Sequence, residues 1–207
     1  MAGPKSTIDL FSIDFVPKRG YDMSMEKPLV KGTAIIPVDV YIKTRWGMKG
    51  REKIWQGLGP EARQVLSGRL VPLSWYPLSV ISELYQKISE IYGSGRPEFC
   101  RPIGRDAADY GLTFVHKLIL RFNTPELLAR RGPELWSSYY QPSIMDMSES
   151  VPGKVVAVIK GLDTSPAHLE SIAGWMERVA ELVGGKNVKV TIDLQEYRYQ
   201  ITYPLDS

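Results

Sequence analysis

The sequence predicts an α+β fold in which a helical N-terminal part precedes a four-stranded antiparallel sheet covered by one helix. Apolar residues recur at helical spacing in much of residues 28–142, whereas alternation with a period of two dominates residues 143–204. In the second range, one helical stretch separates two pairs of strand-like stretches, which gives the order ββαββ. Helices and antiparallel strands that are segregated along the chain are typical of α+β domains.

Length and composition indicate one globular domain. The chain has 207 residues, of which 43% are hydrophobic and 24% charged, enough for one substantial core. We assign residues 28–207 to this domain and residues 1–27 to an N-terminal arm. The arm carries apolar residues in partial alternation, which favours an edge strand or a contact with a partner: Ile8, Leu10, Phe11, Ile13 and Phe15.

The helical part begins with a short strand from Leu29 that leads into a helix near Pro37, and a compact helical region then extends to about Gly68. The clearest helix follows. Its apolar residues recur at helical spacing, Ser74 is its expected N-cap, Pro77 lies in its first turn and Gly93 ends it.

A second long helix is expected over residues 103–122, and its nearly uniform apolar character near the end indicates a central position. Thr124 followed by Pro125 is typical of a new helix start. Because Gly132 and Pro133 repeat that pattern, we expect two short helices in series, the second running from about Pro133 to Tyr140.

The sheet part starts with two strand-like runs, SIMDMSES and GKVVAVIKG, which predict a hairpin. Ser165 and Pro166 then cap and start an amphipathic helix that ends at Gly184 and Gly185. Two alternating strands complete the sheet. Their inward residues are predicted to be Val188, Val190, Ile192, Tyr197, Tyr199, Ile201 and Tyr203.

Several classes of protein are disfavoured. No apolar run approaches the roughly 20 residues of a membrane span, and the N-terminus lacks the apolar centre of a secretory signal, so we expect a cytoplasmic protein. Cys100 is the only cysteine, which excludes an intrachain disulfide. His116 and His168 lack a second ligand at helical spacing, so no metal site is expected. His168 is expected to be exposed.

The net charge and the absence of known motifs disfavour both nucleic-acid binding and a catalytic function. The net charge of +3 is too small to imply nucleic acid, although basic residues cluster in the first two thirds of the chain. That basic face is either simply solvated or contacts a partner. Neither phosphate-binding glycine motif is present, and neither Cys100 nor the pair Asp106 and Asp109 has a specified catalytic partner. We therefore expect no enzyme and no cofactor.

Several short motifs in order resemble an uncharacterised family expanded in myxobacteria. They are VKGT, GPEARQVL, SWYPL, a helix opening at Gly104, Arg105 and Ala107, LILRF, TPELLARR and ELWSSYY. That family is similar to 4-vinyl-reductase-type domains, haem-nitric-oxide-binding domains and small subunits of the Golgi tethering complex. The resemblance implies a helical N-terminal part and a four-stranded C-terminal sheet. It cannot choose between sensing and assembly, because both occur within the group.

The sequence departs from these related families at two places, which makes a metal site and a haem site less expected. The C-terminal strands lack the cysteine cluster that vinyl-reductase-type sensors often carry. Haem-nitric-oxide-binding domains use a histidine on the helix before a YP…PSF-like segment and a YxSxR motif for the haem propionates. Here YYQPSI is similar to the first segment, but PELWSSYY contains no histidine and YxSxR does not occur.

Aromatic side chains concentrate in the helical part and are either solid packing or the wall of a pocket for an apolar ligand. The pocket candidates are Trp75, Tyr76, Tyr110, Phe114, His116, Trp136, Tyr139 and Tyr140. Candidates for contact with an anion at the rim are Arg105, Arg130 and Arg131.

These observations predict a non-catalytic small-molecule-sensing or regulatory domain that acts through protein contacts, with a homodimer expected. One alternative is a dimeric assembly module without a small ligand, which the apolar residues of the N-terminal arm favour. A second alternative is binding of haem or another tetrapyrrole.

Overall fold

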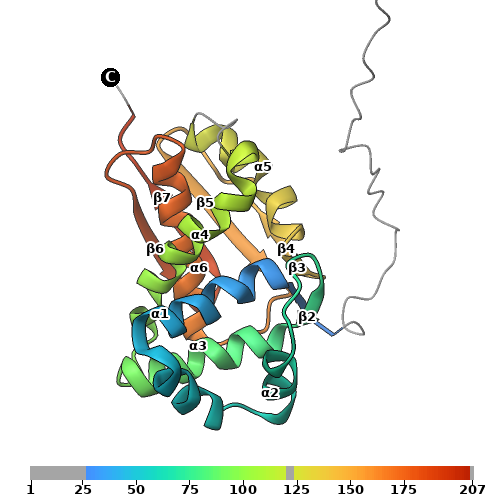
Figure 1. Cartoon of the computed structure of the whole chain (residues 1–207). Helices are drawn as coiled ribbons and strands as arrows, with labels where there is room; N and C mark the ends of the chain where they lie inside the picture. Colours follow the sequence, from blue (N-terminus) through green and yellow to red (C-terminus); the bar gives the residue numbers. More distant parts are fainter. Residues whose placement is uncertain (1–26, 120–123, 206–207) are drawn as a thin grey trace, which may run out of the picture.

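The computed structural model describes residues 27–119 and 124–205, and within the helix that ends at residue 119 it describes side chains up to Tyr110. The predicted arm, residues 1–27, lies outside the described residues except for Lys27. Figure 1 shows the fold as two parts, with α1, α2 and α3 gathered at one end and the main sheet at the other. Within the described residues, no helix is long and apolar enough to cross a membrane.

The helical part opens with a strand and a long kinked helix. Strand β1 (Leu29–Lys31) passes directly into α1 (Gly32–Gln56), so the helix starts five residues before Pro37 rather than at it. Gly47 has φ 65° and ψ −171°, a conformation open to glycine, and it divides α1 into two segments. Helix α2 (Pro60–Ser67) follows, between Gly59 and Gly68.

A second, smaller sheet was not predicted. Residues Trp75–Pro77 form β2, which pairs with β1, while β3 (Tyr140–Gln141) pairs with its other edge, giving the order β2-β1-β3. Helix α3 (Leu78–Tyr92) therefore starts after Pro77, and the prediction of Ser74 as its N-cap was wrong. The backbone before Leu78 is extended because its hydrogen bonds go to β1. Gly93 ends the helix as predicted.

Helix α4 (Arg101–Ile119) follows a short 3-10 helix, η1 (Pro97–Cys100), and α5 (Pro125–Ser137) comes next. The cap at Thr124 is confirmed, since its side chain accepts a hydrogen bond from the Leu127 amide. The prediction of two helices in series was wrong, because α5 continues through Pro133. A proline in a helix interior removes one backbone hydrogen bond and disfavours the helix, but packing of α5 against the sheet holds it in one piece.

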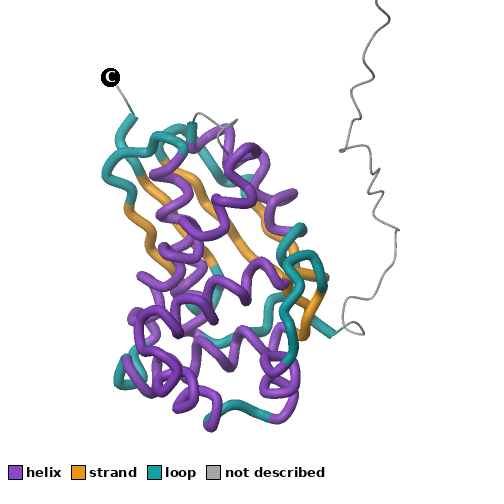
Figure 2. The backbone as a smooth tube through the Cα atoms, viewed as in Figure 1, coloured by secondary structure: helices purple, strands orange, loops and turns teal. Residues whose placement is uncertain are grey.

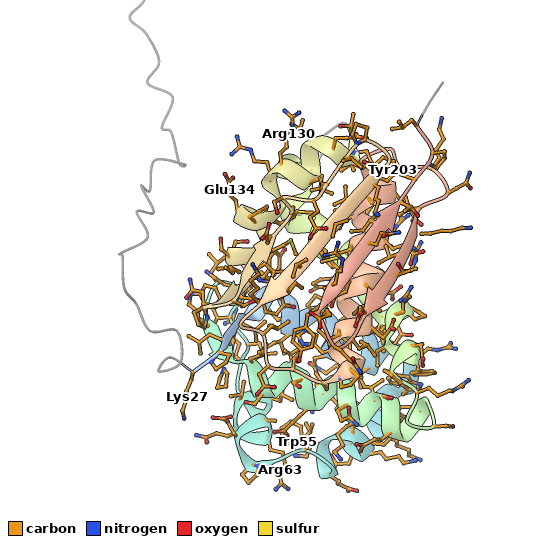
Figure 3. All side chains as sticks on the ribbon, turned by 180° about the vertical axis from the view of Figure 1, so that it is seen from behind. Lys27, Trp55, Arg63, Arg130, Glu134 and Tyr203 are labelled. Carbon is orange, nitrogen blue, oxygen red and sulfur yellow. The ribbon has the colours of Figure 1, made fainter. Side chains whose placement is uncertain are left out.

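The main sheet and its helix confirm the predicted ββαββ order. The elements are β4 (Ile144–Asp146), β5 (Lys154–Lys160), α6 (Pro166–Leu182), β6 (Lys189–Asp193) and β7 (Arg198–Thr202). All neighbours are antiparallel, in the order β4-β5-β7-β6. Figures 2 and 3 show the helices gathered on one face of this sheet. Tyr199 and Ile201 of β7 are buried on that face, as the alternation predicted.

Helices α4 and α6 are in backbone contact through two glycines. A Cβ atom on Gly104 would lie 1.8 Å from the Ser171 carbonyl oxygen, and one on Gly174 would lie 2.0 Å from the Arg101 carbonyl oxygen. No side chain fits in either space. Ion pairs flank the contact, since Arg101 bonds Glu170 at 2.7 Å and Arg105 bonds Glu181 at 2.8 Å. The glycines therefore set the distance between these two helices.

Replacing Gly174 with alanine should destabilise the fold by roughly 1 to 3 kcal/mol, because α4 and α6 must move apart. Urea unfolding of both proteins measures the difference. Gly68→Ala is the control, since a Cβ there meets nothing closer than 3.6 Å, and it should change stability by no more than about 0.5 kcal/mol. Equal stability of Gly174→Ala and the unchanged protein would contradict the close contact.

Candidate ligand-binding site

An apolar cavity of about 120 Å³ lies where α4, α5 and α6 meet the main sheet. Helices α1 and α3 close it at one end through Ala34 and Ile81, and the strands contribute Val155 and Ile201. Small residues on the facing helices leave the space open: Gly104, Ala107, Ala129, Gly132 and Ala180. The cavity therefore touches both parts of the fold.

An aromatic pair forms one wall of the cavity. Trp136 on α5 stacks on Tyr140 with ring centroids 4.2 Å apart, and both rings line the cavity. The Trp136 indole N–H donates a hydrogen bond to Ser143 Oγ at 3.0 Å, so its polar atom is satisfied inside the protein. Tyr139 also lines the cavity and meets Trp175 of α6 edge to face.

His168 is buried in the same wall with both ring nitrogens engaged. Its Nε2 lies 3.1 Å from the Tyr140 hydroxyl, and its Nδ1 lies 2.8 Å from Thr164 Oγ1. The imidazole also stacks on Tyr85, 5.3 Å away. Burial lowers the pKa of His168 to about 3, because the charged imidazolium would lose its hydration. The ring is therefore neutral and held in place.

A larger outer groove of about 630 Å³ adjoins the cavity between α5 and the β4 to β5 hairpin. Unlike the inner cavity, it carries charged side chains on its walls, Glu126, Arg130, Asp146 and Lys160 among them. Four residues line both spaces and so form the wall between them: Ala129, Met145, Met147 and Val155.

The structure brings three of the predicted aromatic candidates together at the cavity and leaves others elsewhere. Trp136, Tyr139 and Tyr140 line it. Trp75 and Tyr76 belong to β2, where Lys31 lies over the Trp75 ring and the Tyr76 hydroxyl accepts a hydrogen bond from the Val71 amide.

Three further aromatic or imidazole candidates lie on α4. Tyr110 is 41% exposed and does not line the cavity. The side chains of Phe114 and His116 lie outside the described part, so their proposed roles stay predictions.

The three arginine candidates lie in different settings. Arg105 forms a two-pronged ion pair with Glu181 between α4 and α6, and Arg131 pairs with Glu134 on the surface of α5. Only Arg130 borders a cavity, the outer groove. Among the described residues, no cluster of three or more His, Cys, Asp or Glu side chains could hold a metal ion.

Sequence reasoning missed several of the lining residues. The expectation that His168 is exposed was wrong, since it is 1% exposed. Its position in the first turn of α6 suggested solvent, but the loop before α6 is pinned to α3 by hydrogen bonds between Ser165 and Ser82. The one hint in the sequence was Thr164, whose hydroxyl, four residues earlier, bonds His168 in the folded protein. Met145, Met147 and Met176 also line the cavity, and no pattern in the sequence pointed to them.

Comparison with known proteins finds likeness in structure alone. No protein-family model and no curated protein matches the sequence. An unliganded Fe(II) H-NOX protein mutant from K. algicida superposes with a TM-score of 0.67 at 15% identity, covering 85% of this chain and 97% of that one.

Two further H-NOX proteins match similarly. One from S. oneidensis in the Fe(II)NO ligation state has a TM-score of 0.64 at 11% identity, with 86% and 99% of the two chains covered. An oxygen-binding H-NOX domain related to soluble guanylate cyclases gives 0.54 at 11%, covering 84% and 94%. The haem-nitric-oxide-binding resemblance therefore holds for the fold, and the other resemblances stay predictions.

The described residues that line the cavity do not fit a haem. A haem needs an axial ligand and room for its macrocycle. Helix α5 has no histidine, both nitrogens of His168 are engaged, and no described arginine or lysine lines the inner cavity. About 120 Å³ suits a single small ring, since an engineered apolar cavity of roughly 150 Å³ binds benzene.

The buried His168 predicts that stability falls with acid. Unfolded histidine binds a proton below about pH 6.5, whereas the folded side chain stays neutral down to about pH 3. Between these values the unfolded state binds more protons, so the free energy of unfolding decreases as pH falls. From about pH 8 to about pH 5 the loss should be roughly 2 kcal/mol.

Urea unfolding of a His168→Gln variant at both pH values tests this. The variant should lose that component of the pH dependence, whatever its overall stability. Tyr140→Phe keeps His168 buried and should retain the drop. An unchanged pH slope in His168→Gln would show that the imidazole is not held neutral.

Proposed function

We propose that this protein is a non-catalytic sensing domain that binds a small apolar molecule in the cavity between α4, α5, α6 and the sheet. The apolar lining and the size of the cavity carry the proposal. A volume of about 120 Å³ accommodates a ligand near the size of benzene. The fold it shares with H-NOX proteins supports sensing by analogy only.

A non-catalytic role agrees with the chemistry of the described lining residues. His168 is neutral and bonded through both nitrogens, so it has no free position as a general base. Cys100 is buried and does not line the cavity, and burial raises the pKa of its thiol to about 12. A thiol in that state is a poor nucleophile near neutral pH.

The position of the cavity suggests how binding would be transmitted. Its walls combine Ala34 and Tyr85 from the helical part with Trp136 and Val155 from the sheet end. A ligand that fills the space adds packing contacts to both parts at once. Binding would therefore favour one relative placement of α5 over another, which is the differential affinity that sensing requires.

Benzene or toluene should raise the stability of the protein, by about 2.7 kcal/mol at 100 times the dissociation constant. A thermal melt with increasing ligand measures this. Ala129→Leu fills part of the cavity and should abolish the effect. Leu127→Met, on the same helix but outside the cavity lining, should preserve it. An unchanged melting temperature at saturating benzene or toluene would contradict the proposal.

A second candidate function, homodimeric assembly, is favoured by exposed apolar side chains on the loop before β2. Leu73 is 76% exposed and Val71 is 46% exposed. If this loop forms a dimer face, Leu73→Asp should convert a dimer into a monomer in sedimentation experiments. Arg63→Asp on α2 is the control and should leave the dimer intact. A wild-type protein that sediments as a monomer at micromolar concentration argues against assembly.

A further inference from the structure

We infer that the inner cavity and the outer groove are two halves of one site for an amphipathic carboxylate, an aryl or alkyl group joined to a carboxylate by a short chain. The inference rests on the proposed function, because the apolar end would occupy the inner cavity. The carboxylate would lie in the outer groove beside Arg130. The wall at Met145 and Met147 would open to let the connecting chain pass.

Two flexible methionine side chains form half of the wall between the two spaces. Ala129, Met145, Met147 and Val155 border both spaces. Methionine has an unbranched side chain that adapts to different packing at low cost. The two thioethers lie directly against α5, because a Cβ on Gly132 would be 2.3 Å from Met147 Sδ and 3.6 Å from Met145 Sδ. In the proposed site, rotation of these side chains would join the spaces.

Both acids in the groove already accept hydrogen bonds from the protein, whereas one cation has no such contact among the described residues. Glu126 accepts a hydrogen bond from the Tyr203 hydroxyl at 2.9 Å, and Asp146 accepts one from the Ser148 amide at 2.9 Å. Asp146 also pairs with Lys160 at 3.4 Å. Arg130, by contrast, has no ion pair or hydrogen bond with any described residue. Figure 3 shows its side chain extending outward from α5.

These charges select an anionic head rather than a cationic one. A guanidinium binds a carboxylate through two parallel hydrogen bonds, whereas a cationic ligand would compete with the hydrogen bonds that Glu126 and Asp146 already accept. The groove also carries Ile144 and Val151, which are 49% and 55% exposed and would contact the connecting chain. The ligand class is therefore apolar at one end and carboxylate at the other.

The test compares two ligand series on the full chain by calorimetry. The first series runs from phenylacetate to 6-phenylhexanoate, and the second contains the alcohols of matched length. One intermediate chain length should bind best, and that carboxylate should bind about tenfold more tightly than its alcohol. Carboxylates that bind no better than alcohols at every length would overturn the inference.

Matched arginine variants locate the head group. Arg130→Gln should remove most of the tenfold preference, and the alcohols should bind to it as to the wild type. Arg131→Gln, on the same helix, removes a side chain that already pairs with Glu134 and should keep the preference. Equal loss in both variants would point to general surface charge and would also overturn the inference.

The two proposals fail in different ways. If benzene stabilises the protein but the carboxylates show no advantage, the apolar cavity binds alone and the groove has no part in it. If neither benzene nor any phenyl compound binds, the proposed function itself fails. If Met147→Ala speeds carboxylate association at least severalfold while Leu127→Met, outside the lining, leaves it unchanged, the methionine wall is the entrance. Unchanged association in Met147→Ala would contradict that role.

Discussion

The backbone contact between α4 and α6 is the constraint on which the rest of this structure depends. Gly104 and Gly174 let the two helices meet without an intervening side chain, and the pairs Arg101 with Glu170 and Arg105 with Glu181 hold them in register. Since α6 packs on the main sheet, the same contact fixes α4 over that sheet. Helix α5 then closes a space that the small residues of all three helices leave unfilled.

Polar groups around that space are satisfied within the protein, which keeps the cavity apolar. Tyr140, His168 and Thr164 form one hydrogen-bonded chain, and Trp136 bonds Ser143. Among the described residues, no buried side-chain nitrogen or oxygen lacks a partner. A cavity with such walls binds by shape and apolar contact rather than by hydrogen bonds. The outer groove supplies the charge that the inner space lacks.

This chain shares its fold with H-NOX proteins, but its described cavity residues differ from those that a haem needs. Identities of 11% to 15% over most of both chains show a shared architecture. The described residues that line the cavity, however, provide neither a free axial ligand nor the space for a macrocycle. A scaffold with a hollow between its helices and its sheet can hold unrelated ligands, because the side chains at the hollow decide what binds.

Local signals in the sequence determined the ββαββ order of elements, the α6 cap at Ser165 and the α5 cap at Thr124, since periodicity and capping act over a few residues. They also marked the aromatic cluster at Trp136 and Tyr140. Tertiary structure alone decided the rest. Strand β2 exists because β1 pairs with it, and α5 runs through Pro133 because it packs on the sheet. His168 is buried because α3 holds the loop before it. The cavity likewise depends on small residues from separate helices that meet only in the folded chain, and no spacing along the sequence records where backbones will meet.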